Sequence, residues 1–215
     1  MRPKELDIDP ANANLTGYLS NATGAGPWTM TTTSSGDDLA HQVSIRNDSA
    51  TDYSGQTFTL AGTDADGRPQ SDVVTGPTAA ATVESAKYFK TLTTSTASGA
   101  GIGADTFDYG WVDEVASQTI PLNHLAGVPP TIEVNLTGTA GYDIEVSMRN
   151  PWGLVYNTDD QEDLAWVNDA NWTAKSADLI DDLALAGFRS MRVVINSYTD
   201  TAEMQVYIVY PSAGI

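Results

Sequence analysis

The segment HQVSIR, residues 41–46, sets the pattern on which the fold prediction rests. Val43 and Ile45 fall on one side of an extended chain, and the polar residues between and beside them fall on the other. Side chains of a β-strand point alternately to the two faces of a sheet. This period of two therefore predicts a strand with one face buried and one face exposed.

Similar runs recur along the chain, and Gly, Asn, Asp and Pro clusters separate them. The alternating runs are TFTL (57–60), IEVNL (132–136), YDIEVSM (142–148), MRVVI (191–195) and MQVYIVY (204–210). The clusters are NDSA (47–50), ADGRP (65–69), TGP (75–77) and TGTAG (137–141), and these residue types favour turns. Many short strands joined by turns predict an all-β protein built of antiparallel sandwich or jelly-roll-like units.

Only one window indicates a helix. It runs from Ser176 to Ala186, with Ser176 as the N-cap, Asp178 in the first turn and Gly187 just beyond the end. Its apolar residues follow a 3.6-residue period only roughly, so we expect two or three helical turns, or a short 3₁₀ segment.

The length of 215 residues fits one large domain or two small ones. Residues 117–131 contain three prolines and no alternation, which indicates a connector. The sequence thus predicts an extended N-terminal arm over residues 1–12, an N-terminal β-sandwich over 13–117, a proline-rich connector over 118–130, and a C-terminal β-sandwich over 131–215. We expect the arm to reach a neighbouring subunit.

The charge balance is strongly acidic. Ten Lys and Arg residues stand against 28 Asp and Glu residues, which gives a formal net charge of −18. Such a field repels phosphate backbones and anionic lipids, so we expect neither nucleic acid nor a membrane as a partner. The chain has no Cys, which excludes disulfides, thiolate metal sites and a Cys nucleophile. No apolar run reaches the length of a membrane span, and the first ten residues lack the apolar core of a secretory signal.

Two acidic stretches raise the question of calcium. The string Asp64-Ala-Asp66-Gly67 resembles the core of a calcium loop, but Gly62 and Val73 occupy the places of the first and last ligands. A hairpin turn is therefore the preferred interpretation of this string.

The second stretch holds Asp159, Asp160, Glu162 and Asp163. Carboxylates this close repel one another unless a cation or solvent intervenes. A solvated loop is the preferred interpretation, and a calcium loop is the alternative. We predict no other metal or cofactor.

Catalytic groups are scarce. His41 and His124 are the only imidazoles, and neither stands in a metal-binding or catalytic motif. The glycine-rich string at residues 99–103 has no Lys and no helix after it, which argues against a phosphate site. With 28 acids, some carboxylate pair is always available for glycoside hydrolysis, but none is indicated. We therefore predict that the protein is not an enzyme and has no catalytic residues.

The tryptophans leave three interpretations open. Trp152, Trp166 and Trp172 lie within 21 residues beside the acidic stretch, whereas Trp28 and Trp111 stand apart. Packing in the core is the preferred role for most of the five. Interface anchoring is the next, because aromatic side chains dominate protein interfaces. A platform on which sugar rings stack is the third.

Several strings together resemble virion proteins of tailed bacteriophages, of the β-sandwich kind. In the first half they are residues 34–52, LAGTDADG (60–67), VVTGP (73–77), AKYFKTLT (86–93) and IGADTFDYGW (102–111). In the second half they are TIPL (119–122), NPW (150–152), MRVVINS (191–197) and MQVYIV (204–209). The resemblance covers nearly the whole chain.

The resemblance implies a structural particle component and carries over no functional residue. A capsid decoration or cement protein fits best. It would bind the major capsid protein or other virion proteins on the outside of the shell, as a homotrimer, in a virion assembled in the host cytoplasm. The alternatives are a tail, neck or fibre-anchoring virion protein, or a carbohydrate-binding adhesion module with Trp152, Trp166 and Trp172 as its stacking platform.

Overall fold

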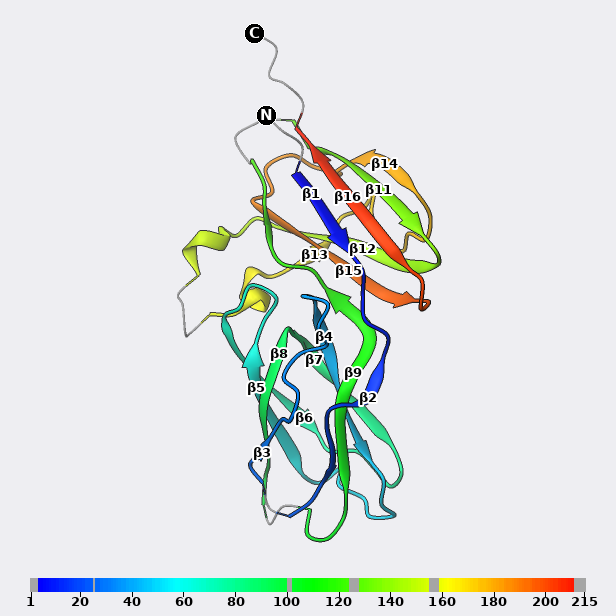
Figure 1. Ribbon diagram of the computed structural model, residues 1–215. Helices are drawn as coiled ribbons and strands as arrows, with labels where there is room; N and C mark the ends of the chain where they lie inside the picture. The colour runs from blue at the N-terminus through cyan, green and yellow to red at the C-terminus, as the bar shows by residue number, and fades with distance from the viewer. Residues whose placement is uncertain (1–3, 25, 100–101, 124–127, 155–158, 211–215) are drawn as a thin grey trace.

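The computed structural model describes residues 4–24, 26–99, 102–123, 128–154 and 159–210 (Figure 1). Within these ranges the secondary structure is almost entirely β, which confirms the predicted fold class. The strands are β1 (Lys4–Ile8), β2 (Asn14–Ala22), β3 (Trp28–Thr29), β4 (Ala40–Asn47), β5 (Thr57–Thr63), β6 (Pro69–Thr75), β7 (Thr82–Phe89), β8 (Thr91–Ala97), β9 (Phe107–Ala116), β10 (Ile120–Pro121), β11 (Thr131–Thr137), β12 (Ala140–Ser147), β13 (Val167–Asn168), β14 (Leu179–Asp182), β15 (Ser190–Tyr198) and β16 (Glu203–Val209). The 3₁₀ helices are η1 (Pro151–Gly153) and η2 (Gln161–Leu164). Neither is long or apolar enough to span a bilayer, and the described residues contain no other helix.

The N-terminal unit is a sandwich of two antiparallel layers, drawn in the lower half of Figure 1. One layer has the strand order β3-β8-β5-β6, and the other is formed by β2, β9, β4 and β7. The apolar residues of the alternating runs point between the layers, as the period of two requires. Phe58, Leu60, Phe89, Phe107 and Tyr109 are completely buried there.

The C-terminal unit repeats this plan in the upper half of Figure 1. One layer has the order β1-β16-β11-β14, and the other contains β13, β12, β15 and β10. Its core is centred on the fully buried side chains of Trp172, Tyr142 and Ile132. The two units thus have separate hydrophobic cores.

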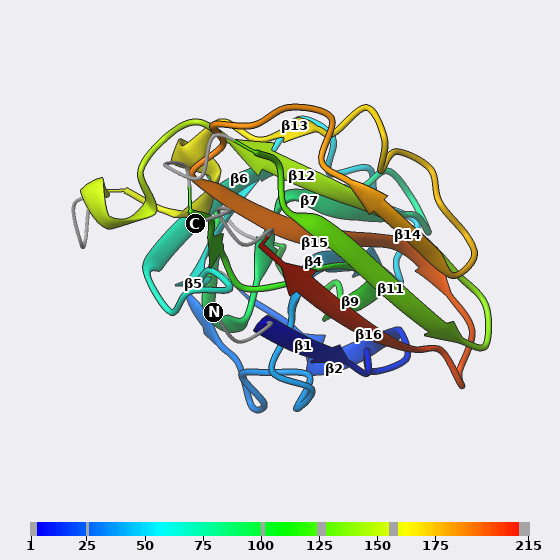
Figure 2. The same ribbon diagram turned by 90° about the horizontal axis from the view of Figure 1, so that it is seen from above.

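The units nevertheless share one sheet. β9 leaves the N-terminal sandwich and pairs with β15, where Val115 faces Ile195 and Ala116 faces Val194. This pairing joins one layer of each unit into a single sheet with the strand order β13-β12-β15-β9-β4-β7. Seen from above, β15 runs diagonally across the middle of the molecule (Figure 2). Two covalently linked sandwiches are therefore also linked by backbone hydrogen bonds.

Residues 4–8 lie within the predicted N-terminal arm, and they form a strand in the same chain. β1 pairs antiparallel with β16 over five residues, with Leu6 opposite Val206. Ile8 is buried at 2% exposure, and Leu6 packs against the C-terminal core. The alternation of Lys4-Glu-Leu-Asp-Ile8 explains this pairing, because it places both apolar side chains on the core side.

The connector over 118–130 also contributes a strand, since β10 pairs with β15. The predicted helix over Ser176–Ala186 is wrong. This segment contains β14, which pairs with β11 so that Leu179 faces Val134. Strand pairing at a free sheet edge prevails over a weak local helix signal, because helix stability depends mainly on tertiary packing.

Candidate functional site

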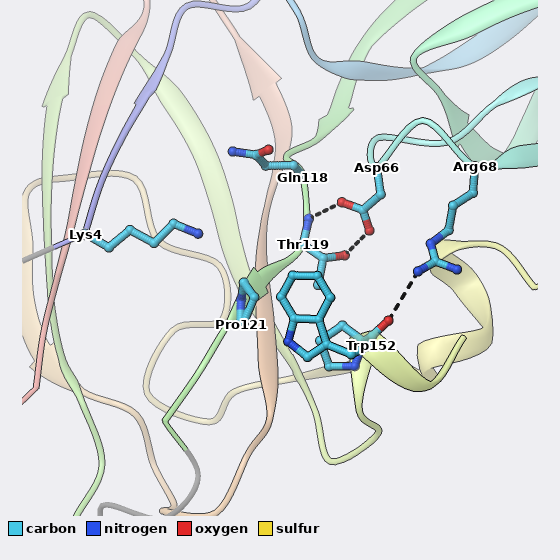
Figure 3. Close-up of a pocket in the computed structure, with 8 residues that line it drawn as sticks. Lys4, Asp66, Arg68, Gln118, Thr119, Pro121 and Trp152 are labelled. Atoms are coloured by element: carbon cyan, nitrogen blue, oxygen red, sulfur yellow. Dashed lines mark hydrogen bonds between the residues drawn. The ribbon is translucent and has the colours of Figure 1, made fainter. Parts of the chain in front are cut away.

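A pocket of about 410 Å³ opens where the two sandwiches meet, and we call it the junction pocket (Figure 3). Four separate parts of the chain contribute to it: β1, the turn between β5 and β6, the segment around β10, and η1. Its lining residues are Lys4, Asp66, Arg68, Gln118, Thr119, Pro121, Pro151 and Trp152. Its volume lies within the range of roughly 300–1,000 Å³ that is typical of small-molecule sites.

The turn between β5 and β6 is organised by Asp64. Its carboxylate accepts hydrogen bonds from the backbone N–H groups of Asp66 and Arg68, at 2.9 and 2.8 Å, and Gly67 takes the left-handed conformation at φ 78°. The string Asp64-Ala-Asp66-Gly67 therefore forms the hairpin turn that the sequence favours. The turn presents Asp66 and Arg68 to the junction pocket.

Asp66 ties this turn to the connector. Its two carboxylate oxygens accept hydrogen bonds from the backbone N–H and the hydroxyl of Thr119, at 2.8 and 2.5 Å (Figure 3). Both oxygens are thus engaged by neutral donors of the same chain. Arg68 reaches the opposite unit, where its Nη2 donates to the carbonyl oxygen of Pro151 at 3.3 Å. Its Nη1 is buried and has no hydrogen-bond partner in the described structure.

Trp152 forms the aromatic wall of the junction pocket and is 78% exposed. Its backbone is held in η1 because the side chain of Asn150 accepts a hydrogen bond from the Trp152 N–H at 3.2 Å. Pro151 occupies the first helical position, where its fixed φ suits the turn. The indole is therefore anchored at its backbone while most of its ring surface remains open to solvent.

Lys4 supplies a second cation to the junction pocket. Burial lowers the pKa of its ammonium group, and the Asp66 carboxylate opposes this shift. Lys4 and Arg68 enter the pocket from opposite sides in the view of Figure 3, with Trp152 between them. The lining thus holds two cations, Lys4 and Arg68, against the single carboxylate of Asp66, which leaves a small positive balance in a strongly acidic protein.

The other tryptophans are not exposed in this way. Trp28, Trp111 and Trp172 are buried at 7%, 7% and 0% exposure. Trp166 covers the Arg192 guanidinium, whose central carbon lies 4.8 Å from the centre of the indole ring. Its indole N–H donates to the carbonyl oxygen of Gln161. The three-ring platform of the sequence analysis is therefore not assembled, and of its members only Trp152 lines a pocket.

The acidic stretch at residues 159–163 forms part of a network between the two units. Asp160 caps η2 by accepting the Glu162 N–H, and it pairs with Lys87 of the N-terminal unit at 2.5 Å. Asp163 completes a capping box by accepting the Asp160 N–H at 2.9 Å. Asp160 and Glu162 are thus held by N–H groups and by the cations Lys87 and Arg192, whereas Asp163 is exposed, so the stretch is only in part the solvated loop of the sequence analysis. Within the described residues no group of three or more His, Asp or Glu side chains is placed to hold a metal ion.

Gln161 and Arg192 stand at the centre of this network. Gln161 is 1% exposed, and its N–H donates to Asp64 at 2.7 Å across the junction. Arg192 is 3% exposed and pairs with Glu145 and Glu162, at 2.6 and 2.5 Å. Burial alone would lower the pKa of Arg192, but these two carboxylates raise it.

Asp64 carries a buried charge at the same junction. Burial raises its pKa to about 6, and the Asp66 carboxylate adds to this effect. The N–H groups of Arg68 and Gln161 act in the opposite direction because they stabilise the ionised form.

His41 has a structural environment, and His124 lies outside the described residues. The ring Nε2 of His41 lies 2.7 Å from Asp37, and Nδ1 lies 3.0 Å from the carbonyl oxygen of Val112. Burial would raise the pKa of Asp37, but the hydrogen bond and charge of His41 hold it well below its usual range, with help from the Ala11 N–H. His41 is completely buried, and its two ring nitrogens are occupied by these contacts.

Sequence reasoning identified Trp152 as a candidate but missed its companions. Trp152 and Trp172 both stand in loop-like contexts, and only Trp152 is exposed, so this context alone does not identify the pocket residue. Lys4 and Arg68 are far apart in the sequence, and no spacing rule connects them. The only available signal was the small number of basic residues, since the chain has ten Lys and Arg residues in all.

Comparisons with protein-family models, with curated proteins and with solved structures find no significant match to this chain.

Proposed function

We propose that this protein is a structural component of a tailed-bacteriophage virion. Its specific role would be that of a decoration protein, which binds the outside of the capsid as a homotrimer and braces neighbouring capsid subunits. The resemblance of its strand and turn strings to virion proteins of the β-sandwich kind supports this proposal. Its all-β architecture is of the expected type.

The observation that supports the proposal best is the continuity between the two sandwiches. A brace must transmit force between two contacts, which a pair of units joined by a loop alone does poorly. In this chain β9 pairs with β15, and Gln161 inserts between the units with bonds to Asp64 and Arg192. The two units are therefore connected by backbone and side-chain hydrogen bonds as well as by the covalent chain.

The net charge of −18 is also consistent with an exposed shell component. An acidic surface is repelled by the packaged genome and attracted to basic or mixed patches on the shell. A partner that binds only the assembled shell stabilises it by mass action, so decoration would raise the resistance of the capsid to heat and internal pressure.

The first test is the native mass of the purified protein, alone and with capsids of the virus that encodes it. We expect an assembly of three 22.8-kDa chains, and saturable binding to the capsid surface. A six- or twelve-fold ring would point to a tail, neck or fibre-anchoring position instead. A monomer that does not bind capsids would contradict the proposal.

A further inference from the structure

We propose that the junction pocket binds an acidic saccharide, with the sugar ring stacked on Trp152 and a carboxylate paired with Arg68. This proposal does not rest on the proposed virion function. The argument rests on the exposed indole, on the two cations, and on the size and composition of the pocket.

The exposed ring of Trp152 is suited to stacking against a ligand. An indole that is 78% exposed leaves a large apolar surface in water, which the protein does not cover with its own chain. The Asn150 cap and Pro151 hold the backbone beneath this ring, so little ordering of the backbone accompanies binding. The apolar C–H face of a pyranose is complementary to such a surface, and its hydroxyl groups would face the amide of Gln118.

The cations give the pocket its preference for an anionic ligand. Arg68 has a buried Nη1 without a partner, and its one hydrogen bond in the pocket is the long contact of Nη2 with the Pro151 carbonyl oxygen. The positively charged guanidinium group lines the pocket, where it can pair with a carboxylate of the ligand. Lys4 adds a second positive charge on the other side of Trp152, so two cations stand against the one carboxylate of Asp66.

The dimensions of the pocket favour a saccharide over a peptide. A volume of about 410 Å³ suits a short saccharide. Four chain segments from both units build the wall, so the site exists only when the sandwiches are joined as the structure has them. Stacking on an aromatic ring combined with a few polar groups is a common way to fix the orientation of a small ligand.

The test is calorimetric titration of the full-length protein with trigalacturonate, with neutral galactotriose as the matched ligand. Because hydrogen bonds to charged groups are stronger than neutral ones, we expect trigalacturonate to bind at least about tenfold more tightly. We also expect its affinity to fall as salt is added, because salt screens exposed charges.

Variants then locate the binding site. Trp152→Ala and Arg68→Gln should each weaken binding of trigalacturonate at least about tenfold, because each removes one of the two principal contacts. Ile180→Ala and Arg46→Gln are the matched controls. Both control residues are exposed and lie outside the pocket, on β14 and β4, so their substitution should leave the affinity unchanged.

Three results would overturn the proposal: equal affinity for the neutral and acidic trisaccharides, no binding of trigalacturonate, or binding that survives both pocket variants. Binding of a glutamate-rich peptide in place of trigalacturonate would also overturn it and assign the pocket to a protein partner. Attachment to capsids is measured independently, so failure of the saccharide proposal is distinguishable from failure of the proposed virion function.

Discussion

Replacement of Arg192 by Met tests the connection between the two sandwiches. Arg192 lies on β15 with only 3% of its surface exposed. Its guanidinium binds the carboxylates of Glu145 and Glu162 and lies 5.3 Å from the ring centre of Tyr88, which belongs to the N-terminal unit. Met retains much of the volume of Arg but offers no charge and no hydrogen bond to these neighbours.

The expected loss follows from what remains after the substitution. Two carboxylates stay in a largely buried site without their cation, and removal of one partner from a buried ion pair costs about 3–5 kcal/mol. For a chain of this size each kcal/mol lowers the melting temperature by roughly 2–4 °C, so the variant should melt about 6–20 °C lower. Combining Arg192→Met with Glu162→Gln should recover at least about 1 kcal/mol, because the second change removes one of the stranded charges.

The assay is urea denaturation followed by tryptophan fluorescence, with calorimetry for the melting temperature. Arg192→Lys serves as the control, since it retains the charge but loses the planar guanidinium group. Its stability should lie between those of the wild type and Arg192→Met. A loss below about 1 kcal/mol for Arg192→Met, or a double variant less stable than the single one, would refute the reasoning.

Three further predictions concern other parts of the structure. Asp37→Asn should cost about 2 kcal/mol at neutral pH, because it weakens the buried bond to His41. The native pKa of Asp37 is depressed, so this stabilisation is present above the ordinary carboxyl pKa of 3.8 and is lost as the pH falls towards the native pKa. Acid denaturation of the wild type and of Asp37→Asn tests this pH dependence. A stability difference between the two proteins that is independent of pH would contradict it. Gly110→Ala should destabilise the protein by at least about 2 kcal/mol, since its Cβ would lie 1.9 Å from the carbonyl oxygen of Asn14, and an unchanged denaturation midpoint would show that β2 can move aside. Trp152→Ala should change stability by less than about 0.5 kcal/mol, whereas Trp172→Ala should cost about 3–5 kcal/mol; denaturation curves compare them, and similar losses would contradict the assigned burial.

The alternating runs made the strands predictable, because burial of one sheet face imposes a period of two on the sequence. The run MRVVI shows the limit of this reasoning. Alternation assigns Arg192 to the polar face, but η2 and Trp166 cover that face and enclose the guanidinium. Whether a polar strand residue meets solvent or another part of the chain depends on non-local packing, which alternation does not report.

The junction pocket was unpredictable for a related reason. Trp152 was one of three candidate platform residues, of which Trp172 is completely buried. Lys4 was assigned to an arm, and Arg68 stood in a turn without known neighbours. β1 contains only two apolar side chains, Leu6 and Ile8, so the local sequence signal for a strand is weak there. Strand order places these residues together, and strand order is set by pairing between distant segments.

The most direct test of the proposed function is quantitative mass spectrometry of purified virions from the virus that encodes the chain. The account predicts that the chain is present in each virion at a copy number comparable to that of the major capsid protein, as attachment of trimers across the shell requires. Virions that lack the chain, or that carry only six or twelve copies, would contradict its role in decorating the capsid.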